Sequence, residues 1–355
     1  MAIAIAALSS GGEDPRPEAR AAVPPECAGD APRDLRRRLG QRLVVRMEGE
    51  ATPALLRQAR AGEIGGVVLF PPSGQDPGAL AGEIERLQTA AAESGGPPLV
   101  VAIDQEGGEV KRLASLPPDV APPELAGDPA AAEEQGLATG EALARIGVNV
   151  DLAPVLDVPA SPDSFVAARS FGDEAASVAA AGTAFASGLR AGGVEATAKH
   201  FPGLGRSAAN TDLEPSEVAG GRGRLAGDLE PFRSAIDAGI GLVMLSSAAY
   251  PALDPGAPAF GSPAIADELL RGGLGFEGVT ITDDLGAGAV RASQEPPEAA
   301  LTAAAGGSDL LLFALDPRPD VLGELVAAAE RGELDPAAVG ASCARIASLR
   351  AGFAG

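Results

Sequence analysis

Three short apolar runs of this sequence end in charged or ionisable side chains that could take part in catalysis or ligand binding. Asp104, the pair Lys199-His200 and Asp283 each stand at the end of such a run. Carboxylates beside Lys, Arg and His hydrogen-bond sugar hydroxyls, and a carboxylate at the base of a pocket can attack an anomeric carbon. A single Asp after a strand often only caps the next helix, but three such ends on one rim favour a ligand site. We therefore predict a carbohydrate site built from these residues.

The pair Lys199-His200 is the least expected dipeptide of the chain. Arg supplies nearly all the positive charge, Lys occurs only at Lys111 and Lys199, and His200 is the one histidine. A lysine at a strand end also fits a Schiff-base aldolase, which is the alternative barrel chemistry. Phosphate binding has less support, because no glycine-rich turn follows a late strand.

The elements that position these residues recur regularly. Eight short runs rich in Val, Leu and Ile predict strands at 42–47, 64–70, 99–104, 148–158, 194–200, 242–246, 279–283 and 309–313. Ala-rich stretches between them predict helices, among them 78–92, 130–146, 174–191, 225–238, 264–271 and 321–331. Most strand runs are continuously apolar, which is typical of parallel strands buried on both faces.

Eight β/α units in about 320 residues predict an α/β fold, a single-domain (β/α)8 TIM barrel, whose site lies at the carboxyl ends of its strands. A doubly wound open sheet would need a glycine-rich phosphate turn after its first strand. Glu48-Gly49-Glu50 follows that strand instead. We expect residues 37–355 to form the barrel and residues 1–36, rich in Pro, Gly and Ala, to form a leader or flexible segment.

Composition excludes several classes of partner. The 355 residues carry a net charge of −22, so the basic footprint that nucleic acid or an anionic membrane requires is missing. No stretch is long and apolar enough to predict an integral membrane span. With one histidine and no cluster at metal spacing, neither a metal nor an organic cofactor is implied.

The chain's start and its two cysteines bear on location. Residues 1–8 are apolar but short and lack a basic segment. The two ends of a closed barrel lie side by side, so Cys27 and Cys343 can form a disulfide, although the sequence leaves open that both are unpaired. These features favour secretion or the cell envelope over the cytoplasm.

Six segments, in this order, resemble glycoside hydrolase family 3 and especially its single-barrel β-N-acetylhexosaminidase branch. They are VAIDQEGG (101–108), DLAPVLDV (151–158), RSFG (169–172), KHFPGLG (199–205), YPALD (250–254) and GFEGVTITDDL (275–285). Each alone is weak, but together they are specific and span residues from about 39 to about 315.

The resemblance implies roles for matching residues. Asp283 stands where the family has its nucleophile, which forms a covalent glycosyl-enzyme. The residues that stand where the family holds the sugar next to the cleaved bond are Asp104, Arg112, Arg169, Lys199 and His200. The implied partner is a carbohydrate, such as a peptidoglycan-derived fragment.

The loop after the fifth predicted strand departs from this branch. Relatives carry there an Asp, then Ser or Thr, then the His that is the general acid/base, whereas this chain reads Asn210-Thr211-Asp212. Leu204 and Ser247 also stand where many relatives have His. The sugar-holding residues and the nucleophile are kept, but the usual proton donor is not.

Three functional hypotheses remain. In the first, the protein is a retaining glycosidase in which Asp212, or the nearby Glu214 or Glu217, donates the proton, since retaining enzymes ordinarily use two carboxylates. In the second, it binds a glycan with weak turnover or none. The third is Schiff-base chemistry on Lys199, which we rank below the others.

Overall fold

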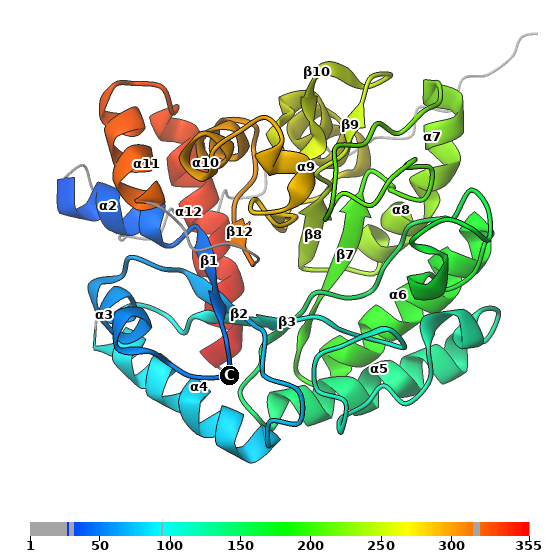
Figure 1. Cartoon of the computed structure of the whole chain (residues 1–355), viewed down its shortest axis with the longest axis horizontal. Helices are drawn as coiled ribbons and strands as arrows, with labels where there is room; N and C mark the ends of the chain where they lie inside the picture. The colour runs from blue at the N-terminus through cyan, green and yellow to red at the C-terminus, as the bar shows by residue number, and fades with distance from the viewer. Residues whose placement is uncertain (1–26, 28–31, 94, 315–319, 355) are drawn as a thin grey trace, which may run out of the picture.

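The computed structural model describes residues 27, 32–93, 95–314 and 320–354. Eight parallel strands form its centre and helices surround them (Figure 1). The strands are β1 (Leu43–Met47), β2 (Gly66–Leu69), β3 (Val100–Ile103), β6 (Val150–Asp151), β7 (Glu195–Phe201), β8 (Leu242–Leu245), β11 (Val279–Thr282) and β12 (Leu311–Phe313). The eight predicted strands and the (β/α)8 barrel are thus confirmed.

The sheet closes on itself. Its strand order is β11-β8-β7-β6-β3-β2-β1-β12, and a parallel bridge between Ile281 and Leu310 joins the two ends. The Thr282 amide donates to the Leu310 carbonyl at 3.0 Å, and the Leu310 amide donates to the Thr280 carbonyl at 2.8 Å. Closure brings all eight carboxyl ends to one rim.

Helices cover the outside of the barrel. They are α2 (Pro32–Gly40), α3 (Pro53–Ala61), α4 (Pro77–Ala92), α5 (Pro129–Ala144), α6 (Ala175–Ala191), α7 (Arg222–Asp228), α8 (Glu230–Asp237), α9 (Gly288–Arg291), α10 (Pro296–Ala305), α11 (Val321–Glu330) and α12 (Pro336–Ala351), with a π-helix at Ala264–Gly273. Short hairpins β4 (Gln105–Gly107) with β5 (Val110–Lys111), and β9 (Ala249–Tyr250) with β10 (Asp254–Pro258), follow β3 and β8. Short 3-10 turns occupy Pro122–Leu125, Ala167–Arg169, Ala259–Gly261 and Gly352–Ala354.

A capping residue followed by proline starts four of these helices. The caps are Thr52, Asp76, Asp128 and Asp335, and each side chain accepts from a backbone amide of the first turn. Proline fits the next position because its missing N–H would have no partner there and its φ already suits a helix. The sequence therefore marks these helix starts locally.

Two predicted boundaries differ because of proline. The helix expected over 225–238 is divided at Leu229, since Pro231 lacks the amide that would continue the hydrogen-bond ladder of α7. The strand expected over 148–158 pairs regularly only at Val150–Asp151, and Pro154 follows. The helix expected over 264–271 has π geometry.

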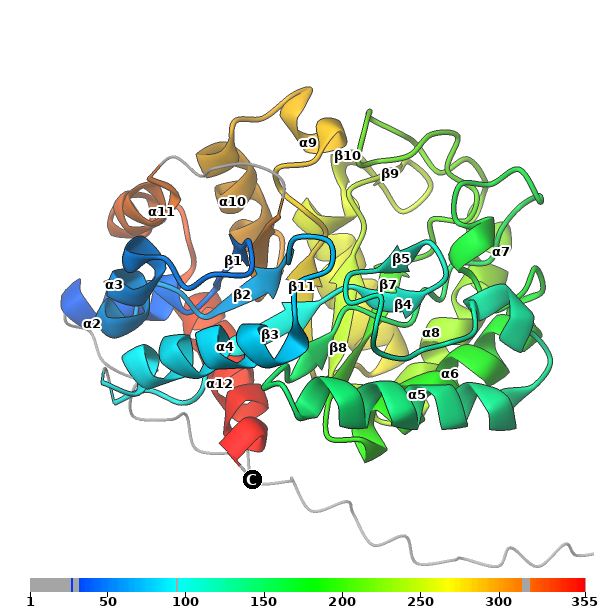
Figure 2. The same cartoon turned by 60° about the horizontal axis from the view of Figure 1, so that its bottom comes forward.

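Side chains that alternate along the strands fill the barrel interior. Val44, Val100, Val150 and Ile281 belong to this inner cluster, whereas their strand neighbours pack outward against the helices. Ile346 of α12 packs onto the inner cluster. In Figure 2, α12 lies at the end of the barrel opposite α9 and the hairpin β9–β10. The amino end of the barrel is therefore filled.

A disulfide joins the first described residue to the last long helix. Cys27 and Cys343 are bonded, both are buried, and their Cα atoms lie 5.6 Å apart. This resolves the alternative that the sequence left open. The helix α2 begins at Pro32, five residues before the barrel was expected to start. The rest of the expected leader, residues 1–26 and 28–31, lies outside the described residues. The division at residue 36 stays a prediction.

Candidate functional site

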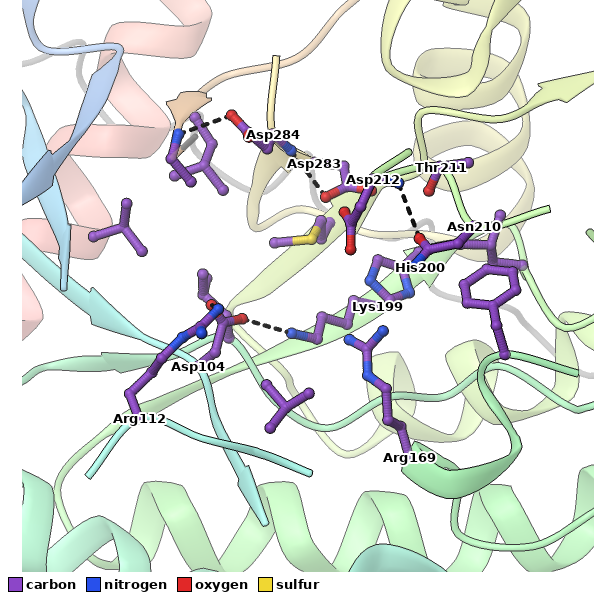
Figure 3. A pocket seen from close by; sticks show the side chains of 18 of the residues that line it. Asp104, Arg112, Arg169, Lys199, His200, Asn210, Thr211, Asp212, Asp283 and Asp284 are labelled. Atoms are coloured by element: carbon purple, nitrogen blue, oxygen red, sulfur yellow. Dashed lines mark hydrogen bonds and ion pairs between the residues drawn. The ribbon is translucent and has the colours of Figure 1, made fainter. Parts of the chain in front are cut away.

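A cavity of about 170 Å³ opens at the carboxyl rim of the barrel. Inward-facing side chains at or just after the ends of four strands form part of its lining: Val68, Leu152, Met244 and Leu312. All seven site residues that the sequence predicted line it (Figure 3): Asp104, Arg112, Arg169, Lys199, His200, Asp212 and Asp283. The structure thus brings together residues that are up to 179 positions apart in sequence.

Lys199 lies at the centre of the charged side of this cavity. Its Nζ is 2.9 Å from Asp104 Oδ1 and 2.6 Å from Glu106 Oε1, and its side chain is 2% exposed. Burial alone would lower the pKa of Lys199, but the charges of Glu106 and Asp104 raise it above its usual value. A Schiff base needs an unprotonated amine, so this environment argues against the aldolase alternative.

Glu106 is a site residue that belongs to the segment VAIDQEGG but was not among the predicted site residues. Its carboxylate accepts two bonds from Arg169, from Nε at 2.8 Å and from Nη2 at 2.7 Å. Burial would raise the pKa of Glu106, but Lys199 and Arg169 lower it to about 2. This fixed anion holds both cations in place, so that their remaining N–H groups can face a ligand.

Arg112 closes the cavity beside β2 and β3. Its Nη2 is 3.4 Å from Asp104 Oδ2, and its guanidinium lies 4.4 Å from the centre of the Phe70 ring. The guanidinium of Arg46 lies at the same distance from that ring. Stacking on an aromatic face restricts the long Arg side chain and fixes where its donors point.

His200 is oriented by Asp157, which was also not among the predicted site residues. His200 Nδ1 lies 2.7 Å from Asp157 Oδ2, while Asp157 Oδ1 accepts from the backbone amides of His200 and Leu204 at 3.2 and 2.6 Å. Asp157 is fully buried. Because Nδ1 is engaged, Nε2 is the ring nitrogen that remains for a ligand or for Asp283.

Asp283 directly follows β11 at the opposite wall, beside His200 and Asp212 (Figure 3). Its amide donates to the Leu245 carbonyl at 2.9 Å, which fixes its backbone to β8. Burial raises the pKa of Asp283, the His200 charge lowers it, and the Asp212 charge raises it again. The neighbouring Asp284 differs, since its Oδ1 accepts from the amides of Gly286 and Ala314 and so shapes the loop.

Asp212 stands on a loop that is fastened to the start of α9. The Gly288 amide donates to the Asp212 carbonyl at 2.9 Å, and the Ala289 amide donates to the Thr211 carbonyl at 3.1 Å. The Asn210 side chain accepts from the Asp212 amide at 2.9 Å and so orients the backbone of Asp212. The carboxylate itself remains exposed at the mouth of the cavity.

The other two acids of this loop are placed differently. Glu214 and Glu217 are both exposed, and Glu217 lines a separate groove behind the loop. Of the three acids that the sequence offered as proton donors, Asp212 is the one among the residues lining the cavity. Its role remains a prediction.

Asp151 lies beneath the charged cluster and is fully buried. Its Oδ1 accepts from the Gln105 amide at 3.0 Å. Burial raises its pKa to about 8, and Lys199 offsets only part of that rise. Asp151 therefore supports the loop after β3 through its hydrogen bond to Gln105.

The described residues offer neither a metal cluster nor a membrane-spanning helix. Within ranges 32–93, 95–314 and 320–354 no group of three or more His, Cys, Asp or Glu side chains could hold a metal ion. Over the same described residues, no helix has the length and hydropathy that would let it cross a membrane.

Comparison with known proteins identifies the family. The family model "Glycosyl hydrolase family 3 N terminal domain" matches residues 34–349. A secreted glycosyl hydrolase of Arthroderma benhamiae is 33% identical over 89% of this chain and 93% of its own length. The beta-hexosaminidase LpqI of Mycobacterium tuberculosis is 36% identical over 72% of this chain and 69% of its own.

A solved structure agrees in fold and in length. The beta-N-acetylhexosaminidase of Beutenbergia cavernae superposes with a TM-score of 0.81 at 36% identity, covering 89% of this chain and 98% of that one. The barrel, the rim cavity and these matches together show that the chain belongs to glycosyl hydrolase family 3 and is a glycosidase.

Proposed function

We propose that the protein is a retaining β-N-acetylhexosaminidase that acts on β-N-acetylglucosaminides or related β-glycosides through a covalent glycosyl-enzyme on Asp283. The observation that carries the proposal is one rim cavity that is lined both by the carboxylates of Asp283 and Asp212 and by the fixed cations Arg169 and Lys199. A retaining glycosidase needs one carboxylate as nucleophile and one as acid/base.

In the first step, Asp283 attacks the anomeric carbon while the glycosidic bond breaks. Protonated Asp212 gives its proton to the departing oxygen, so that the leaving group departs as an alcohol. In the second step, ionised Asp212 takes a proton from water, whose oxygen attacks the anomeric carbon and releases Asp283. Asp212 thereby returns to its protonated form.

The surrounding residues support these steps. Asp104, Arg112 and Arg169 offer acceptors and donors to the hydroxyls of one sugar ring. The charge of His200, which Asp157 holds in place, lowers the pKa of Asp283 and so favours the ionised nucleophile. Ion pairs within the protein itself hold Glu106, Arg169 and Lys199 in place, so little reorganisation is needed on binding.

The substrate and the location are part of the same proposal. Relatives named beta-hexosaminidases suggest an N-acetylated sugar, such as a terminal residue on a peptidoglycan-derived fragment. The Cys27–Cys343 disulfide and the relative described as secreted support a site of action in an oxidising compartment outside the cytoplasm.

Hydrolysis of an activated aryl N-acetylglucosaminide tests this function. The Asp283→Asn variant should lose about 10³-fold or more in kcat, because the nucleophile is gone. Glu277→Gln, at the opposite end of β11 and exposed, is the matched control and should retain activity. Full activity in Asp283→Asn would overturn the proposal, and glycan binding without turnover in the native protein would favour the binding hypothesis.

A further inference from the structure

A second cavity, of about 450 Å³, opens on the same face of the barrel as the catalytic cavity. We call it the rear groove and define it by the segments 215–217, 255–258 and 289–290 together with Ser247, Ala249, Phe260, Ser293 and Gln294. Figures 1 and 2 both place α9 beside β9 and β10, which form its sides. No step of the proposed mechanism uses the rear groove.

One loop separates the rear groove from the catalytic cavity. Residues 210–212 line the catalytic cavity, and residues 215–217 line the rear groove. The amides of Gly288 and Ala289 hold the loop between them. The rear groove therefore lies immediately behind Asp212, on the side away from the sugar-holding cluster.

Leu213 stands on this dividing loop, next to Asp212, and is 76% exposed. In the described part of the chain it and Leu137 are the exposed large apolar side chains. The Leu213 side chain therefore does not pack in the core. The apolar faces of sugars usually lie on aromatic rings, but the aromatic residue in the lining of the rear groove, Phe260, is buried. An exposed leucine at this position offers a substitute surface.

Ser247 supplies a polar group inside the rear groove. It follows β8, is 6% exposed, and its hydroxyl has no hydrogen-bond partner in the structure. A buried hydroxyl without a partner is unfavourable, so a ligand hydroxyl or amide that bonds to it would be stabilised. Glu217 and Gln294 add a carboxylate and an amide to the same lining.

We infer that the rear groove binds the leaving-group side of the substrate, as a second pyranose linked to the sugar that is released. This rests on the proposed function, because the general acid must lie beside the glycosidic oxygen. With one sugar in the catalytic cavity and Asp212 at its mouth, the next residue of the chain crosses Leu213 and enters the rear groove. Ser247 then receives a hydroxyl or acetamido group of that second sugar.

Filling the rear groove tests the inference. Ser293 is exposed and lines the rear groove, whereas its neighbour Ala292 is equally exposed and is not among the lining residues. Ser293→Trp should lower kcat/KM for a β-1,4-linked N-acetylglucosamine disaccharide about tenfold relative to kcat/KM for the 4-nitrophenyl monosaccharide. Ala292→Trp should leave that ratio unchanged. If the ratio of kcat/KM for the disaccharide to kcat/KM for the monosaccharide is the same in Ser293→Trp and Ala292→Trp, the inference is wrong.

A binding measurement separates this inference from the proposed function. Calorimetry on the Asp283→Asn protein should show that the disaccharide binds more tightly than the monosaccharide and that Ser247→Ala removes several-fold of this advantage. If neither Ser293→Trp nor Ser247→Ala changes the disaccharide's advantage, the rear groove is not the subsite even if hydrolysis occurs. If the protein binds both sugars with this pattern but hydrolyses neither, the rear groove stands and the catalytic proposal fails.

Discussion

Two networks of buried charge lie at opposite ends of the barrel, and they have different purposes. The rim network, at the carboxyl ends of the strands, consists of Asp104, Glu106, Arg169 and Lys199. The base network, at the amino ends, consists of Arg42, Arg271, Asp309 and Arg345. Both contain ion pairs shorter than 3 Å, so burial and pairing alone do not distinguish a ligand site from a structural one.

The base network directs its donors inward to the protein. Asp309 is fully buried and accepts from Arg271 at 2.8 Å, from Arg345 at 2.7 Å and from the Thr280 amide at 3.0 Å. Arg42 donates to the carbonyls of Asp309 and Ser308, and burial lowers its pKa to about 10. The rim network instead lines a cavity. The difference shows that the end of the barrel, together with an open cavity, marks the functional cluster.

Replacing the anion of the base network should give the largest effect on stability. Asp309→Asn leaves Arg42 and Arg271 buried beside a neutral group, and we expect the free energy of unfolding to fall by about 3–5 kcal/mol. Activity per folded molecule should stay within about twofold, since the rim is untouched. Urea unfolding combined with active-site titration measures both. Glu63→Gln, in a half-exposed ion pair with Arg36, is the control and should change stability little.

A large loss of activity per folded molecule in Asp309→Asn would contradict the separation of the two networks.

The matching change at the rim is Glu106→Gln. It should lower kcat/KM about 100-fold, which corresponds to about 2.7 kcal/mol of transition-state stabilisation, because Arg169 and Lys199 lose the anion that holds them. Stability should fall as well. Glu109→Gln, at an exposed residue of the same loop, should change neither kcat/KM nor stability. Normal kinetics in Glu106→Gln would mean that the rim network is only structural.

The rim can also be disturbed without removing a charge. A methyl group added at Gly288 would lie 2.1 Å from the Leu213 carbonyl oxygen, so Gly288→Ala must displace the loop that carries Asp212. We expect about a tenfold loss of kcat/KM on natural disaccharides and a smaller loss on aryl glycosides, whose leaving groups need little acid assistance. Gly82→Ala, on α4 with open space around it, is the control. Equal losses of kcat/KM on both substrates would show that the position of this loop does not affect proton donation.

The smallest expected effect concerns pH. Asp283 must be ionised to attack, so kcat/KM falls as the pH drops through its pKa, which burial and the Asp212 charge raise. His200→Gln removes the positive charge that lowers the pKa of Asp283, so the acid limb of the profile should move to higher pH on an activated aryl substrate. Glu214→Gln should leave the limb in place. An unchanged limb in His200→Gln would show that the His200 charge does not act on Asp283.

The residues of the rim could be chosen from the sequence because their signal is local. Each of them stands at the end of an apolar run: Asp104, Lys199, His200 and Asp283. Closure of the barrel then brings these strand ends together at one rim. Their partners carried a weaker signal. Glu106 stands two residues after Asp104, but its bond to Arg169 spans 63 positions. Asp157 lies beyond β6, and only the three-dimensional path of β7 brings it to His200.

The base network had no comparable signal. Arg42 and Asp309 stand at the starts of predicted strands, where a charged residue is usually solvated. Their contact spans 267 positions and depends on barrel closure, and Arg345 joins from α12. Likewise, the docking of Asp212 on α9 depends on two backbone amides, which any sequence provides. Such contacts follow from the fold and cannot be read from residue type.

Locating the covalent intermediate tests the central claim most directly. The Asp212→Ala protein, given an activated aryl N-acetylglucosaminide, should form the glycosyl-enzyme but lack the base that hydrolyses it, so the adduct should accumulate. Peptide mass analysis after rapid acid quenching should find the added sugar on Asp283. A sugar attached to another residue, or turnover of this substrate by Asp283→Asn at the native rate, would contradict the account.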